Sequence, residues 1–277
     1  MTKKRMLSYI ELSSPVHSLT GASKLIIFLL WSVLVMVSFE TPILIFFAVM
    51  GIVFFKISKV KFKDVSFIIK MMSVFLVLNL LAIYLFSPEN GVSIYNTRNV
   101  ILEGTTRFTL TWEQIFYEFN VFLKYITIIP PALLLMVTTH PSEFAASLNK
   151  IGIPYTVSYS VSITLRYIPD IQRDFEAIYQ SQQARGLELS GKASVIKRIK
   201  RTVPLLLPLV ISSIERIDVI SRAMELRGFG KNKKRTWYCE KQFKKRDYIS
   251  IILAVFLFTA GIIYTFIDGN RFFNPFI

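Results

Sequence analysis

The sequence predicts an all-α integral membrane protein with about five transmembrane helices and a cytoplasmic domain of long amphipathic helices. Three observations predict this fold class. Hydrophobic residues make up 53% of the 277 residues, which exceeds the level usual for a soluble domain. Several apolar runs approach the length that is needed to cross a bilayer. The net charge of +15 is concentrated in one long polar segment that lies between such runs.

An N-terminal membrane part, residues 1–138, holds four expected spans at about residues 22–39, 42–56, 65–86 and 119–138. The first two are short for a bilayer of about 30 Å, so we expect a tight hairpin that turns at Pro42. A re-entrant pair is the alternative for this region. The fourth span carries Pro130 and Pro131, which we expect to kink it. Residues 248–277 hold the fifth span and the C-terminus.

The distribution of lysine and arginine predicts the orientation. Most of the 33 basic residues lie in residues 139–247, which we therefore place in the cytoplasm together with the N-terminus. The Ser87–Glu118 loop carries more glutamate than arginine and is expected outside, as is the C-terminus. No small-residue cleavage site follows the basic start, so we expect a retained N-terminus. The basic clusters lack interleaved aromatics and flank the spans, which favours anionic lipid or an acidic partner over nucleic acid.

Two amphipathic helices are expected within residues 139–247. Apolar residues recur at i+3 and i+4 spacing from Val157 to Ile178 and again from Val203 to Met224. Pro154 and Pro204 are expected near the two helix starts. The apolar faces are expected to pack on each other and on the inner ends of the spans, because a large exposed apolar patch favours aggregation.

Both helices are expected to end in an Arg-Gly pair. The first end is Ala184-Arg185-Gly186 and the second is Leu226-Arg227-Gly228. Each arginine follows an apolar stripe residue by seven positions, close to two helical turns, so it lies nearly in line with that stripe. Each glycine can adopt the left-handed conformation that closes a helix. One such end is ordinary, but two aligned ends suit a protein interface, because the planar guanidinium can bind carboxylates or backbone carbonyls.

Other motifs in the sequence could indicate a different function. Gly186–Lys192 reads G-x-x-x-x-G-K, but Ala193 stands where a phosphate-binding loop needs Ser or Thr, and a helix precedes it. Asp170 and Asp174 could hold Mg²⁺ in a membrane-bound transferase, which is the alternative function, although pairs with Arg166 and Arg173 are the simpler account. The sequence has one cysteine and two distant histidines, which predicts no metal site. A permease that transports alone is disfavoured, because charge within the spans is sparse.

The stretch Pro141–Gly230 carries a family resemblance. HPSEFAASLNKIGIPYTVSYSVSITLRYIPDIQRDFEAIYQSQQARG and LLLPLVISSIERIDVISRAMELRGFG resemble the segments that lead to the two Ala-Arg-Gly motifs of the transmembrane T component of energy-coupling factor transporters. SPVHSLTGASKLI is similar to the approach to the first span of that family. In the second motif, Leu226 replaces the usual alanine, so we expect its tip to sit differently.

The resemblance implies a non-catalytic coupling subunit in the cell membrane of a bacterium or archaeon. Its expected partners are two ABC-type ATPase subunits and a substrate-binding membrane subunit, the S component, which imports a vitamin or a metal ion. ATP and Mg²⁺ are expected in the ATPases, and no cofactor is expected in this chain. The expected docking residues are Ala184, Arg185, Gly186, Leu226, Arg227 and Gly228. The transported substrate is chosen by the separate S component.

Overall fold

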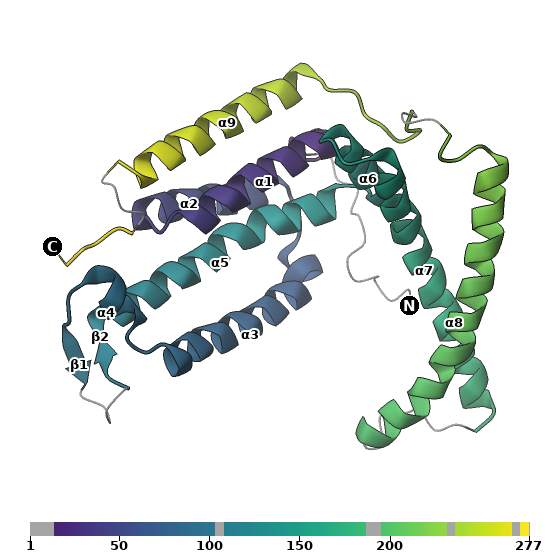
Figure 1. Ribbon diagram of the computed structural model, residues 1–277, viewed down its shortest axis with the longest axis horizontal. Helices are drawn as coiled ribbons and strands as arrows, with labels where there is room; N and C mark the ends of the chain where they lie inside the picture. The colour runs from purple at the N-terminus through teal and green to yellow at the C-terminus, as the bar shows by residue number, and fades with distance from the viewer. Residues whose placement is uncertain (1–13, 103–107, 187–194, 232–235, 268–271, 277) are drawn as a thin grey trace. The chain divides into compact units, whose positions relative to one another are not determined.

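The computed structural model of the protein describes residues 14–102, 108–186, 195–231, 236–267 and 272–276, with the backbone alone for 195–201. In these ranges the chain is almost entirely helical, with one two-stranded sheet (Figure 1). The chain divides into two compact units. The first unit is Met1–His140 with Lys241–Ile277, and the second unit is Pro141–Glu240.

The helices of the first unit fit a membrane protein. They are α1 (Gly21–Val37), α2 (Thr41–Ile57), α3 (Phe62–Phe86), the short α4 (Asn90–Tyr95), α5 (Trp112–Thr138) and α9 (Lys245–Thr265). Three of them, α3, α5 and α9, are long and apolar enough to cross a bilayer, whereas α1 and α2 are shorter apolar helices. The predicted helical membrane protein agrees with this arrangement. The count of five spans and their orientation stay predictions.

The core of the first unit forms where α1, α2 and α5 meet. Trp31 packs edge-on against Phe47 with ring centroids 4.9 Å apart, and Leu34 and Leu44 are fully buried beside them. The Trp31 indole N–H donates to the backbone oxygen of Thr127 at 3.2 Å. The apolar side chains of these helices therefore surround the indole N–H of Trp31, which has a hydrogen-bond partner, as a buried polar group requires.

Helices α1 and α9 run side by side in the same direction. At their starts, the Asp247 carboxylate accepts from the Ser23 hydroxyl at 2.6 Å and from the Thr20 backbone N–H at 2.7 Å. Further along, Gly261 faces Leu34 so closely that an added Cβ would lie 2.7 Å from a leucine methyl. One polar contact and one glycine thus fix the two helices at both ends of their shared length.

The predicted loop Ser87–Glu118 contains regular structure. It includes α4 and an antiparallel pair of strands, β1 (Val100–Leu102) and β2 (Leu110–Thr111). Helix α5 begins at Trp112, before the predicted start of the fourth span near residue 119, and the bounds of the span itself stay a prediction. The reason for the earlier helix start is a local cap, since the Thr111 hydroxyl accepts from the backbone N–H of Gln114 at 3.3 Å. A hydropathy pattern alone does not predict such a helix cap.

The beginning of α5 is tied to the residues before it. Glu113 is fully buried and accepts from the backbone and side-chain nitrogens of Asn99 at 2.9 to 3.1 Å. Gln114 is also fully buried and accepts from the Gly91 backbone N–H at 2.9 Å. Tyr95 at the end of α4 is 3% exposed, and this burial raises the pKa of Tyr95 to about 12.

The second unit holds α6 (Pro141–Lys150), α7 (Tyr155–Ala184) and α8 (Val195–Leu226). Both predicted amphipathic helices are present, and α7 begins after Pro154 as expected. The expected start of the second helix near Pro204 is wrong, because α8 begins at Val195 and runs through Pro204 and Pro208. Both prolines lie on the exposed side of the helix, so the carbonyls that lose a backbone partner are not sealed in a core.

Candidate functional site

The candidate site consists of two helix ends, and the first is the end of α7. The helix stops at Ala184, and the Arg185 N–H still donates to the Ser181 oxygen at 3.2 Å. The Gly186 N–H donates to the Gln183 oxygen at 3.0 Å, with φ of +87° at Gly186. Only glycine adopts this conformation without strain, so the sequence stops the helix here and leaves Arg185 at its tip.

The end of α8 has the same construction. Arg227 donates to the Ala223 oxygen at 3.2 Å, and Gly228 has φ of +68°. The N–H of Gly228 donates to Glu225 at 2.9 Å, and the N–H of Phe229 donates to Met224 at 2.9 Å. This is the bonding of a Schellman motif. The predicted left-handed glycines at both Arg-Gly ends are confirmed.

Both helix ends are exposed on the surface of the second unit. Ala184, Arg185 and Gly186 are exposed, as is Arg227. Leu226, where the related motif has alanine, is 90% exposed. An apolar side chain with this exposure contributes almost nothing to the fold of the chain itself, so its burial is available to a partner.

The two ends lie at opposite ends of the pair that α7 and α8 form (Figure 1). Phe229, just after the end of α8, packs on Tyr159 near the start of α7, with ring centroids 4.8 Å apart. Tyr159 precedes Arg185 by 26 residues in one helix. At a rise of 1.5 Å per residue, the two helix ends lie more than about 30 Å apart. They therefore cannot grip one small ligand together.

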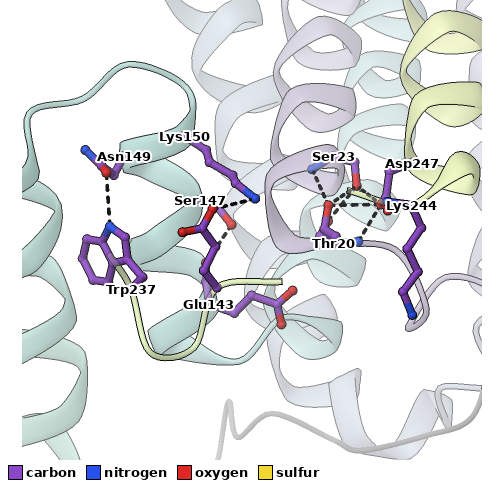
Figure 2. Close-up of polar contacts among 10 residues, drawn as sticks. Thr20, Ser23, Glu143, Ser147, Asn149, Lys150, Trp237, Lys244 and Asp247 are labelled. Carbon is purple, nitrogen blue, oxygen red and sulfur yellow. Dashed lines mark hydrogen bonds and ion pairs between the residues drawn. The ribbon is translucent and has the colours of Figure 1, made fainter. Parts of the chain in front are cut away.

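The segment that follows the second helix end is anchored to α6. The Trp237 indole N–H donates to the Asn149 side-chain oxygen at 3.1 Å, and Lys150 pairs with Glu240 at 2.9 Å. Figure 2 shows Asn149 directed toward the Trp237 ring. Trp237 also packs on Tyr155, with centroids 5.3 Å apart. Sequence reasoning missed this anchor, because its partners are about 90 residues apart and follow no periodic pattern.

The proposed transferase carboxylates are each engaged by an arginine. Asp170 pairs with Arg173 of the same helix, and Asp174 pairs with Arg216 of α8 at 2.6 Å. Among the residues that the structure describes, no group of three His, Cys, Asp or Glu side chains could hold a metal ion. Asp174 therefore joins the two long helices where they cross, which accounts for its charge without a metal.

The apolar stripe of α8 is exposed in this chain. Leu205 and Leu209 are buried, and two residues of the predicted stripe, Ile220 and Met224, are half-buried. The other five are 51–65% exposed: Val203, Leu207, Val210, Ile214 and Ile217. Within the second unit, the neighbouring helices leave this face of α8 uncovered, and its expected packing on the inner ends of the spans stays a prediction. The two buried leucines are four residues apart and occupy a different side of the helix from the stripe. The structure thus leaves a continuous apolar surface on the helix that carries Arg227.

The glycine-lysine motif gives no site in the described residues. Gly186 closes α7, as the helix end requires, while residues 187–194 lie outside the described ranges. The basic side chains at 192 and 197–201 also lie outside the residues whose side chains are described.

Comparison with known proteins gives consistent matches. The family model CbiQ, described as cobalt transport protein, matches residues 12–238, a range that includes both Arg-Gly ends. The energy-coupling factor transporter transmembrane protein EcfT of Lactococcus lactis subsp. cremoris is 26% identical over 268 residues, which cover 93% of this chain and 96% of that protein. EcfT of Streptococcus thermophilus is 31% identical over 183 residues, with coverage of 63% and 69%. EcfT of Listeria innocua is 37% identical over 145 residues, with coverage of 49% and 54%.

Proposed function

The chain belongs to the CbiQ family, with EcfT transmembrane proteins of energy-coupling factor transporters among its relatives, and on this premise we propose that it couples ATPase subunits to nutrient uptake. Its partners in this proposal are two ABC-type ATPases and a substrate-binding S component that imports a vitamin or a metal ion. The chain is multi-pass in the cell membrane, with the N-terminus and the second unit in the cytoplasm and the C-terminus outside.

One observation carries the proposal, namely the pair of matching helix ends. Each presents an arginine at the C-cap and a glycine with positive φ, and the ends lie at opposite ends of one crossed helix pair. Two identical or closely similar ATPase subunits would offer two equivalent grooves, so two equivalent tips are what such a dimer requires. The arginine fork can bind carboxylates or backbone carbonyls in each groove.

The chain contributes mechanical coupling in this proposal, and the ATPases bind ATP and Mg²⁺. When the ATPases close on ATP, they draw the two tips together and move α7 and α8 as rigid helices. The Asp174–Arg216 pair and the aromatic packing of Phe229 on Tyr159 hold the helices to each other, so a displacement at one tip reaches the other. The exposed apolar face of α8 is then available to contact the S component.

The test replaces Arg185 and Arg227 with glutamate, singly and together, in the full transporter. Each single variant should weaken co-purification of the ATPases, and the double variant should abolish ATP-driven uptake, because a carboxylate cannot donate the hydrogen bonds that the arginine fork makes to carboxylates or backbone carbonyls. Arg222→Glu is the matched control, since Arg222 is an exposed arginine of α8 that precedes the tip. Normal assembly and uptake in the double variant would exclude the docking role.

The alternative transferase makes a different prediction for the same preparation. It requires the lone chain to turn over a diphosphate lipid with Mg²⁺, and this turnover should disappear in Asp170→Asn. The coupling proposal expects no such turnover from the lone chain. It also expects ATP-driven uptake to survive in Asp170→Asn, because the ion pair of Asp170 with Arg173 lies within one turn of α7 and does not join the two helices.

A further inference from the structure

The first unit contains an open cavity of about 740 Å³ between α1, α2, α5 and α9. This volume lies within the range of about 300–1,000 Å³ that is typical of small-molecule sites. All of its lining residues belong to the first unit. Trp31 and Phe47 of the core form part of the wall, and Leu253 and Phe258 of α9 form another part.

The polar residues of the lining gather at one end of the cavity. Most of the lining is apolar, and the exceptions are Ser18, Lys24, Thr138, Arg246 and Ser250. Ser18 and Lys24 flank the start of α1, Arg246 and Ser250 lie in the first turns of α9, and Thr138 is the last residue of α5. The contact between Asp247 and Ser23 brings the starts of α1 and α9 together (Figure 2). The cavity therefore has one polar end and a long apolar body.

The polar end is cationic. Lys24 is 7% exposed, and its ammonium donates to the Thr138 backbone oxygen at 2.9 Å, at the negative end of the α5 dipole. Arg246 is exposed at the same end of the cavity, whereas the neighbouring Asp247 carboxylate is occupied by hydrogen bonds from Ser23, Thr20 and Lys244 and is not part of the lining. Lys24 therefore brings a positive charge to the polar end of the cavity.

We propose that this cavity binds one anionic phospholipid of the surrounding membrane, with the phosphate at Lys24 and Arg246 and an acyl chain along the apolar body. Charge complementarity identifies the occupant, because a ligand that matches an apolar body with a single cationic end is an amphiphile with an anionic head. Basic pockets between transmembrane helices bind anionic headgroups in the same way. This inference is independent of the proposed coupling role.

Native mass spectrometry of the full chain in detergent tests the proposal. The probes are phosphatidylglycerol and phosphatidylcholine with identical acyl chains. Phosphatidylglycerol should bind the native chain more tightly, and Arg246→Gln should weaken its binding about tenfold, as expected for loss of one charge-assisted hydrogen bond. Lys245→Gln is the matched control, because Lys245 is also exposed, carries the same charge one residue away and does not line the cavity. It should change the affinity less than about twofold.

A second pair of variants tests the position of the acyl chain. Ala254 lines the cavity, so Ala254→Phe should fill the apolar body and reduce binding of both lipids. Ala260 is exposed on α9 outside the lining, and Ala260→Phe should leave binding unchanged. Equal affinity for the two lipids, equal effects of Arg246→Gln and Lys245→Gln, or full binding by Ala254→Phe would each overturn the proposal. So would loss of a protein subunit from the purified transporter on Ala254→Phe with lipid binding intact, since a protein helix would then be the occupant.

Discussion

The Asp247 carboxylate at the start of α9 accepts a 2.6 Å hydrogen bond from the hydroxyl of Ser23, which precedes it by 224 residues. Asp247 is 1% exposed and also accepts from the Thr20 backbone N–H and the Lys244 backbone N–H. The last helix of the first unit is thus attached to the first helix through one side chain (Figure 2). The predictions below begin with this contact.

Replacing Asp247 with alanine should lower the free energy of unfolding by about 3 kcal/mol or more, because it leaves several buried donors without an acceptor. Asp247→Asn keeps one acceptor oxygen and should cost less. Thermal unfolding of the purified chain measures both effects. Asp218→Ala, at an exposed position of α8, is the control and should change stability by less than about 0.5 kcal/mol. Equal losses in Asp247→Ala and Asp218→Ala would contradict the assigned role.

Gly91 should not tolerate any side chain. A Cβ at this position would lie 2.4 Å from the backbone oxygen of Glu113, and backbone atoms at the start of α5 cannot move away cheaply. Gly91→Ala should therefore destabilise the chain by about 2–4 kcal/mol. Gly51→Ala is the matched control, because a Cβ there meets Pro130 and Trp31 at ordinary distances of 3.5–3.6 Å. Calorimetry should find it neutral or stabilised by up to about 1 kcal/mol.

Leu226→Ala should distinguish a role of this side chain in the stability of the chain from a role in binding a partner. The side chain is 90% exposed, so the substitution should change the stability of the chain by less than about 0.5 kcal/mol. If Leu226 is buried in an ATPase groove, the same substitution should weaken association with that ATPase by about tenfold. Binding to the isolated ATPase by surface plasmon resonance gives the comparison. Unchanged affinity, with Arg227→Glu still disruptive, would show that the leucine lies outside the contact.

Tyr95 should make the stability sensitive to high pH. Burial raises its pKa from 10.0 to about 12 in the folded chain, so the neutral phenol is favoured there. The resulting stabilisation is fully present below pH 10 and is lost as the pH rises through 12. A shift of this size corresponds to about 3 kcal/mol. Tyr95→Phe should lose less stability than the native chain between these pH values, whereas the fully exposed Tyr238→Phe should follow the native curve.

The exposed face of α8 should make the isolated chain aggregate. Replacing Val210, Ile214 and Ile217 with serine should reduce self-association in size-exclusion chromatography, because all three are more than half exposed. Each substitution should change stability by less than about 0.5 kcal/mol. Serine at the buried Leu205 and Leu209 should instead destabilise the chain. A native chain that stays monodisperse without partners would contradict this prediction.

Local sequence patterns predicted the helix ends well. An Arg-Gly pair after an apolar stripe is a local signal that is enough to predict where α7 and α8 end. Both glycines have positive φ, as this signal predicts. Helix α5 begins before the predicted span, at Trp112, because the mixed polar stretch from Trp112 to Glu118 is held in the helix by the Thr111 cap and by Asn99. Asp247 and the Asn149–Trp237 contact could not be found, because their partners are distant in sequence and the residues follow no helical period.

For the α8 stripe, the sequence predicted which residues share a face but not which helices of the second unit cover it. Periodicity shows that Val210, Ile214 and Ile217 share one face but does not show what covers that face. In a subunit of an assembly, such an apolar face can be covered by a partner protein instead of by the chain itself. Leu205 and Leu209, which do pack within the chain, fall between the stripe positions and did not stand out in the pattern.

The crossing of α7 and α8 has equal arms. Arg185 follows Asp174 by 11 residues, and Arg227 follows Arg216 by the same number. Each tip therefore lies about 16 Å along its helix from the ion pair that joins the two. If this pair acts as a fulcrum, equal forces at the two tips exert equal torques about it, and neither tip has the greater leverage.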